Sequence, residues 1–265
     1  GSLLDSTTSD DNTAVGYDCL LRNTTGASNT AVGATALDAN TTASNNTAIG
    51  HLALTTTVSG ANNTAMGFAA LKSCTGSGNT AVGLDSQEDT SSGTDCTSIG
   101  IQAGKANTTG DNNLYLGHDS GISGSPGGNN TAGNSAVFIG DENIGDAHIQ
   151  VDWTVASDQR DKTDFTALDL GLDFVKALAP VTYKWDKRSK YGDKTADGYD
   201  LASQSPDGTH KEDWLDIGFK AQEVEALEIA AGYNKSSKTN LVSSHSNDGK
   251  QMGLQYSKFV PILVK

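Results

Sequence analysis

Apolar and polar positions repeat with a fixed period along the first half of the chain. The pentapeptide NTAVG or a variant of it closes on glycines 16, 33, 50, 67, 83, 100 and 117, in steps of 17 residues with one step of 16. A degenerate copy, AVFIG, ends at Gly140 after an insertion rich in glycine and serine. Self-similarity at a fixed period indicates a repeat architecture, in which each unit stacks on its neighbours.

Each period contains two stretches that read as short strands. The first is the alternating Asn-Thr-Ala-Val stretch before the glycine, which is typical of a half-buried strand. The second surrounds a leucine four residues after the glycine, found in the first four copies as Leu20, Leu37, Leu54 and Leu71. The remaining residues are turn formers. We therefore predict a shaft of stacked 17-residue units, a β-solenoid or β-prism.

The apolar column of this shaft is only one residue wide. It consists of Val15, Val32, Ile49, Met66, Val82, Ile99 and Leu116, which we expect to form the core. So thin a core is marginal for a single chain, whereas chains around a common axis would bury these columns against each other. The pattern favours a parallel homo-oligomer, and it leaves open whether each chain forms its own solenoid or the chains intertwine.

From residue 163 the pattern changes to that of an α+β domain. Apolar residues recur there at helical spacing, and short alternating stretches stand between them. The predicted elements are a helix over 164–179 capped by Asp164, a strand over 181–185, a loop or hairpin over 186–213, a strand entering a helix over 217–227, and a helix within 254–265 with Phe259, Ile262 and Leu263 on one side.

Charge changes at the same place. Residues 1–156 hold three basic and fifteen acidic side chains, whereas residues 157–265 hold fifteen and seventeen. This shift predicts a domain boundary near residue 156. An acidic shaft argues against nucleic acid as a partner, because phosphates would be repelled. No apolar run is long enough for a membrane span, so we expect no membrane insertion.

Little else in the sequence predicts chemistry. Cys19, Cys74 and Cys96 share no motif spacing, which favours small reduced packing residues. His51 and His118 each follow a repeat glycine and are expected at the surface. We expect no cofactor, no metal and no substrate-directed enzyme site.

Four blocks of the second half carry a resemblance. They are SDQRDK, ALDLGLDFVKALAPVTYKW, IGFKAQEVEAL and YSKFVPILVK, in this order. Together they resemble the intramolecular chaperone domain at the C-terminus of phage tail spikes and fibres, the endosialidase-type auto-processing domain. The family's start motif, Ser-Asp-x-Arg-x-Lys, is matched by Ser157, Asp158, Arg160 and Lys162. Asp161 and Phe165 depart from it, because the family usually has an apolar residue and an isoleucine there.

The resemblance covers residues 157–265 and implies a homotrimeric clamp that folds the fibre ahead of it and then cuts itself off. Cleavage at Ala156–Ser157 would use the Ser157 hydroxyl as nucleophile and Lys162 as base, a single-turnover Ser-Lys endopeptidase. A lysine accepts a proton only as the neutral amine, which burial in a trimer interface would favour and a neighbouring acid such as Asp161 would oppose. Asp158 and Arg160 are expected as capping and ion-pairing support.

The sequence as a whole thus predicts the distal part of a homotrimeric phage tail fibre or spike, located in the virion tail. Residues 118–156 would form the tip. The degenerate repeat that ends at Gly140 and the insertion at 120–133 would contact a host receptor, a glycan or an outer-membrane component. The chaperone domain would be released in the host cytoplasm. Two alternatives stay open: a structural fibre or adhesin whose C-terminal domain clamps without cutting, and the stalk of a polysaccharide-degrading spike with its enzyme domain upstream.

Overall fold

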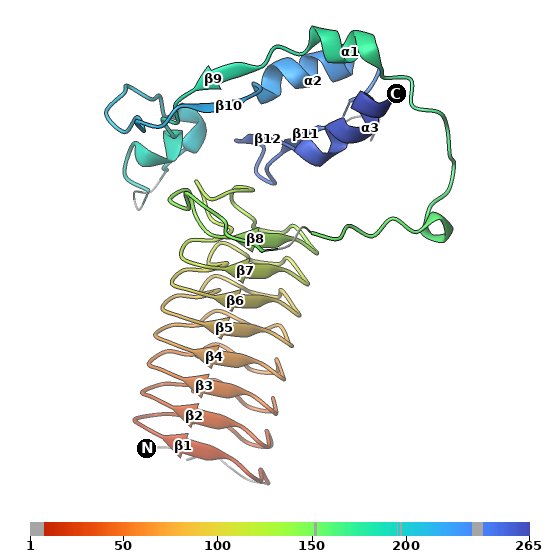
Figure 1. Cartoon of the computed structure of the whole chain (residues 1–265). Coiled ribbons are helices and arrows are strands. Elements are labelled where there is room, and N and C mark those ends of the chain that lie inside the picture. Colours follow the sequence, from red (N-terminus) through yellow and green to blue (C-terminus); the bar gives the residue numbers. More distant parts are fainter. Residues whose placement is uncertain (1–7, 151–152, 195, 197, 235–240) are drawn as a thin grey trace.

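The structure, a computed structural model, describes residues 8–150, 153–194, 196, 198–234 and 241–265. A β-solenoid is followed by a region of helices and small sheets (Figure 1). The predicted fold class, a repeat shaft followed by an α+β domain, is therefore confirmed. What the sequence predicts for residues 1–7 and 151–152 of the shaft, and for residues 235–240 of the second half, lies outside the described residues.

One short strand per coil builds the solenoid. In the described residues, eight strands pair in parallel and in chain order. Equivalent residues of successive coils pair with each other. Thr30 pairs with Thr47 and, across the single 16-residue step, Thr64 pairs with Thr80. The shorter period is thus absorbed in a loop. The strands are β1 (Thr13–Val15), β2 (Thr30–Val32), β3 (Thr47–Ile49), β4 (Thr64–Met66), β5 (Thr80–Val82), β6 (Thr97–Ile99), β7 (Leu114–Leu116) and β8 (Val137–Ile139).

The second strand predicted in each period is wrong. Leu20, Leu37, Leu54 and Leu71 have left-handed backbones, with φ values of 49°, 52°, 51° and 51°. A strand requires negative φ, so these segments are turns. They nevertheless stack, because the backbone N–H of Leu20 donates to the carbonyl of Ala36 in the next coil at 3.0 Å.

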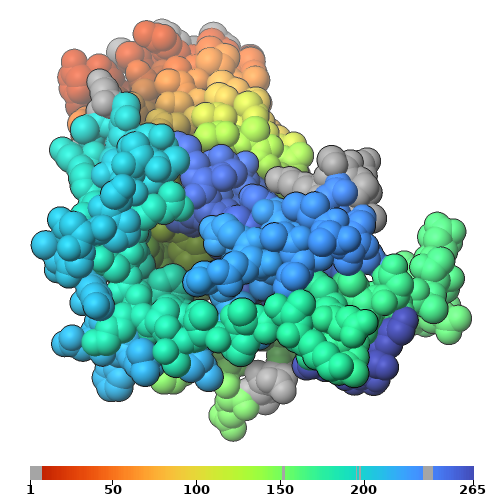
Figure 2. All heavy atoms as spheres, turned by 90° about the horizontal axis from the view of Figure 1, so that it is seen from above, coloured from red at the N-terminus to blue at the C-terminus, as the bar shows by residue number. Residues whose placement is uncertain are grey.

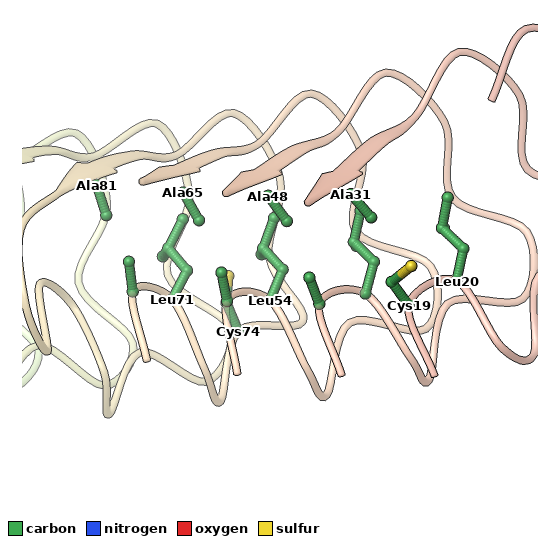
Figure 3. Close-up of a cluster of buried hydrophobic side chains, with 13 residues drawn as sticks. Cys19, Leu20, Ala31, Ala48, Leu54, Ala65, Leu71, Cys74 and Ala81 are labelled. Carbon is green, nitrogen blue, oxygen red and sulfur yellow. The ribbon is translucent and has the colours of Figure 1, made fainter. Parts of the chain in front are cut away.

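The core of the shaft lies inside the single chain and is not the column that the sequence predicted. Its side chains are alanines from the strands, among them Ala31, Ala48, Ala65 and Ala81, and the four leucines from the turns (Figure 3). The predicted column faces outward instead: Val15 is 58% exposed, Met66 42% and Ile99 47%. Side chains of successive strand residues point to opposite faces. The expectation that valine points inward therefore assigned the whole column to the wrong face. The small alanine lets the strand approach the leucine turn closely within a narrow coil.

Buried asparagines connect successive coils. Asn29, Asn46, Asn63 and Asn79 form one ladder inside the solenoid and are at most 1% exposed. The backbone N–H of Asn46 donates to Oδ1 of Asn29 at 3.0 Å, and its own Nδ2 donates to the carbonyl of Gly60 at 2.9 Å. Buried backbone groups require partners, and this ladder supplies them from coil to coil. The asparagines therefore bond the coils together from inside rather than serving as surface turn formers.

The three cysteines occupy internal positions of the same solenoid. Cys96 takes an asparagine's place in the ladder, where its backbone N–H donates to Oδ1 of Asn79 at 3.0 Å and its thiol donates to Gly110 O at 3.2 Å. Cys19, Cys74 and Cys96 are all buried and free. The prediction of reduced packing residues is confirmed.

Thiol labelling should distinguish folded from unfolded shaft. Burial raises the pKa of the Cys74 thiol to about 11, and burial also raises the pKa of Cys96. Because the thiolate is the reactive form, we expect a disulfide reagent at pH 8 to label none of the three cysteines in the folded protein and all three in guanidinium chloride. Rapid labelling of the folded chain would show that the solenoid interior is open to solvent.

The α+β region packs around one small apolar core. Leu170, Phe174, Val224, Val242, Phe259 and Ile262 are its buried members. In the described residues β9 pairs with β10, and β11 with β12, both antiparallel. The elements are α1 (Leu172–Ala177), β9 (Val181–Tyr183), η2 (Arg188–Lys190), η3 (Leu201–Ser203), β10 (Asp216–Gly218), α2 (Ala221–Ala230), β11 (Ser243–His245), β12 (Met252–Leu254), η5 (Tyr256–Lys258) and α3 (Phe259–Val264).

Three details of this region differ from the prediction. The helix expected over 164–179 is confined to α1, because Asp164 has a φ of 55° and does not cap a helix. Leu263, expected beside Phe259 and Ile262, is 62% exposed. The hairpin of β11 and β12 was not predicted, because its three-residue strands lie in or beside a polar stretch.

The α+β region lies over the β8 end of the solenoid (Figure 1). Seen from above, its segments cover that end. The segment that connects the solenoid to α1, called the arm below, projects to one side (Figure 2). No helix in the described part of the chain combines the length and apolar character needed to cross a membrane.

Candidate self-cleavage site

The predicted cleavage site lies on the arm between the solenoid and α1. A single 3₁₀ turn, η1 (Gln159–Asp161), interrupts an otherwise extended segment and stands well apart from both folded parts (Figure 1). Asp158 caps this turn, since its carboxylate accepts the backbone N–H of Arg160 at 2.9 Å. Asp158 thus caps a 3₁₀ turn and not an α-helix.

The turn brings Ser157 and Lys162 together. Nζ of Lys162 lies 2.6 Å from Oγ of Ser157 and 3.3 Å from the Ser157 carbonyl oxygen. The chain closes on itself here because the backbone N–H of Lys162 donates to Gln159 O at 3.2 Å. The predicted nucleophile and base are thus within hydrogen-bond distance, and Ala156 immediately precedes them.

The two supporting residues form an ion pair. Nη2 of Arg160 lies 2.6 Å from Oδ2 of Asp158, and Nε lies 3.1 Å from Oδ1. Hydrogen bonds from the Arg160 side chain and backbone hold the pKa of Asp158 below its usual range. This pair fixes the shape of the turn that sets Ser157 opposite Lys162.

The whole segment is exposed to water. Every residue from 153 to 167 is exposed, including the two departures from the family motif, Asp161 and Phe165. The geometry therefore presents a hydroxyl, its base and the peptide bond before them, but the single chain excludes no water from the site.

A second group of titratable side chains lies at the top of the solenoid. One ligand atom each from His118, Asp119 and Asp141 lies within 4.8 Å of the others. Burial alone would raise the pKa of Asp141, but hydrogen bonds from Asn143 and His118 lower it. These residues could hold a metal ion; yet Asp141 is already bonded to Asn143 N at 2.8 Å and His118 Nδ1 at 3.3 Å, contacts that need no ion.

The chain thus has a repetitive shaft followed by an α+β region that begins near the candidate site. Residues 157–233 match the model of a protein family described as chaperone of endosialidase. The match begins at Ser157, runs through α2 and covers less than a third of the chain. No curated protein and no solved structure matches the chain. A β-solenoid shaft with a chaperone-of-endosialidase domain fits a phage tail fibre or tail spike.

Proposed function

We propose that this chain is the distal part of a homotrimeric phage tail fibre or spike that attaches the virion to a host cell. Residues 157–265 would drive trimerisation and folding, and would then release themselves by cleavage at Ala156–Ser157. The observation that carries the cleavage is the 2.6 Å contact between Lys162 Nζ and Ser157 Oγ at the start of the family match.

The reaction balances with the groups at hand and one water molecule. Oγ of Ser157 attacks the Ala156 carbonyl carbon while its proton passes to the neutral Lys162 amine. The bond from that carbon to the Ser157 nitrogen breaks, the nitrogen leaves as an amine carrying that proton, and an ester remains. Water hydrolyses the ester, which leaves a carboxylate on Ala156 and a free amine on Ser157.

Assembly would switch this reaction on. A neutral lysine amine is favoured by burial, whereas Ser157 and Lys162 are exposed in the single chain. We therefore propose that the neighbouring chains of a trimer cover the arm and exclude water from it. Cleavage would then follow correct folding rather than precede it.

The outer face of the solenoid supports self-association. Two outward columns are apolar over much of the shaft, one represented by Val15, Ile49, Met66 and Ile99, the other by Tyr17, Phe68, Leu84 and Ile101, all more than a third exposed. Soluble monomers rarely expose so continuous an apolar surface. A second and a third copy fit it best, because their columns repeat with the same period and match coil for coil.

A clamp would be needed because the shaft is nearly self-similar. Chains that slip by one whole period keep most of their contacts, so the repeats alone specify register poorly. A domain that trimerises first would set the register, and coils would then form from that end.

The tip would be uncovered by release. The insertion at 120–133 lies on the last coil and contacts the α+β region through Gly127, Asn129 and Asn130. Departure of that region in the host cytoplasm would expose this surface for a receptor, a glycan or an outer-membrane component. No nucleic acid or membrane enters this function.

The exposure of Ser157 and Lys162 also favours one alternative, a structural fibre or adhesin whose clamp does not cut. Intact mass and light scattering on the freshly purified chain separate the two. The proposal predicts a trimer and two pieces, residues 1–156 and 157–265. A trimer of whole chains would establish the clamp alone, and a monomer would remove both functions.

A further inference from the structure

The end of the solenoid is bonded by a loop from the α+β region. The loop comprises residues 246–251 and joins β11 to β12. Nδ2 of Asn247 donates to Oδ1 of Asn130 at 3.0 Å, and the backbone N–H of Asn247 donates to Gly127 O at 3.1 Å. Oδ2 of Asp248 accepts the backbone N–H of Asn129 at 3.0 Å. These three bonds join residues more than one hundred positions apart in sequence.

The same side-chain bond connects one pair of neighbouring coils within the shaft. Nδ2 of Asn40 donates to Oδ1 of Asn23 in the preceding coil at 2.8 Å, which is the contact that Asn247 makes with Asn130. The shaft asparagines Asn23, Asn40 and Asn130 also bond the backbone of their own turns. Asn130 Nδ2, for example, donates to Gly133 O at 3.2 Å. Asn247 therefore stands one step beyond Asn130, at a position of the coil that asparagine holds in some coils and threonine or cysteine (Thr57, Cys74 and Thr90) holds in others.

The direction of the backbone bonds agrees as well. Backbone bonds between coils run both ways: Thr108 N donates to Thr131 O of the next coil at 2.8 Å, and Gly33 N donates to Val15 O of the preceding coil at 2.8 Å. Asn247 N donates back to Gly127 O in the second way. Asn129 N donates onward in the first way, with the Asp248 carboxylate in place of a carbonyl. The loop thus presents both kinds of partner that a further coil would present.

Glycines leave the room that this contact needs. A Cβ on Gly128 would lie 2.6 Å from Oδ1 of Asp248, and a Cβ on Gly133 would lie 2.9 Å from Nδ2 of Asn247. At Gly133 the nearest atom is Oδ1 of Asn130, so a side chain at either glycine would displace a side chain that makes this contact, Asp248 or Asn130.

The loop is held rigidly on its own domain. The buried carboxylate of Glu228 on α2 accepts the backbone N–H groups of Val242 at 2.5 Å and Ser243 at 3.2 Å. His245 pairs with Glu225 of the same helix at 2.6 Å. The hairpin therefore projects from α2 in a fixed direction.

A second contact sets the orientation of the domain on the shaft. Lys187 Nζ donates to the carbonyl of Glu142 at 2.8 Å, Lys194 pairs with the Glu142 carboxylate, and Lys190 bonds to Asn143. Basic side chains from one segment thus meet the acidic end of the shaft, beside the loop but independent of it.

We propose that residues 246–251 act as a terminal rung of the solenoid, a surrogate coil through which the clamp binds the finished end of the shaft. This inference rests on the proposed role of residues 157–265 as a folding clamp. It assigns the partner surface on the shaft to Gly127, Asn129 and Asn130, and it means that the clamp binds that end only when the last coil has its folded hydrogen-bonding pattern.

Hydrogen exchange on the full chain tests the rung. All variants carry Ser157→Ala, so that every chain stays whole. Asn247→Ala removes the rung side chain, whereas the matched control Lys250→Ala, in the same loop, removes only a 2.8 Å pair with Asp200 inside the α+β region. We expect about tenfold faster exchange over 122–140 in Asn247→Ala, the change that follows from losing a hydrogen bond of about 1.4 kcal/mol.

Two further results decide the inference. Exchange over 13–66 should be unchanged in both variants, and Lys250→Ala should match the parent throughout. Equal exchange over 122–140 in Asn247→Ala and Lys250→Ala, with the trimer intact by light scattering, would overturn the rung and leave the clamp standing. A monomeric parent would overturn the clamp function, while the exchange comparison would still decide whether the loop bonds the coil.

Discussion

Replacing Ser157 by alanine is expected to leave the chain whole under conditions that cut the parent into residues 1–156 and 157–265. The alanine keeps the backbone of the arm but removes the atom that attacks the Ala156 carbonyl, so no ester can form. Ser157→Cys should restore cleavage, since a thiol is a competent nucleophile at the same place. Intact mass over time measures all three chains.

Lys162→Ala is expected to slow the same cleavage by about 10²–10⁴-fold, the usual contribution of a positioned general base. Lys176→Ala, on α1, is the matched control and should cut like the parent. Trimer content has to be equal in all of them, because assembly is proposed to precede cleavage. Cutting of Lys162→Ala at the parental rate would exclude this lysine as the base, and cutting of Ser157→Ala would exclude the serine as the nucleophile.

Gly67→Ala should destabilise the shaft strongly. A Cβ at Gly67 would lie 2.3 Å from the carbonyl oxygen of Gly83 and 2.7 Å from its carbonyl carbon, both backbone atoms of the next coil. Its φ of 143° is also one that side chains strain to adopt. We expect a loss of about 3 kcal/mol or more in the free energy of unfolding, measured by denaturant titration of the β-sheet circular dichroism.

Gly145→Ala controls for the loss of glycine itself. Nothing lies within 4 Å of a Cβ at Gly145, so the free energy of unfolding of Gly145→Ala should stay within about 0.5 kcal/mol of the parent value. Similar losses in Gly67→Ala and Gly145→Ala would mean that the coils are not packed as closely as the structure places them.

The sequence was sufficient for the period of the shaft but not for its inward face. Each coil is one structural unit, so its 17-residue spacing is visible directly in the repeated glycines. A strand of three residues such as Thr47–Ile49 is too short for its alternation to decide which side is buried. Valine and isoleucine are the more apolar choice, yet from β2 to β5 the inward position of the strand faces the leucine turn across a narrow coil and is held by alanine, a constraint of packing that no single repeat reveals.

The site shows a similar division. Ser157 and Lys162 could be paired from the start motif, because they are five positions apart and a local turn brings them together. Their exposure in the single chain could not be predicted, because the start motif does not say which elements pack against the segment that carries it. The rung at Asn247 was equally beyond reach, because its partner Asn130 lies 117 positions away and the loop that carries it is short and polar.

Because equivalent residues of successive coils pair, the length of the shaft is set by the number of its coils. Neighbouring strands lie ~4.8 Å apart, and β1 to β8 follow one another in chain order without a crossover. Duplication or loss of one period in the gene would change the reach of the fibre by ~4.8 Å and leave the faces at both ends as they are. Shaft length can therefore change independently of the last coil and of residues 157–265, and the 16-residue period shows that such copies need not be perfect.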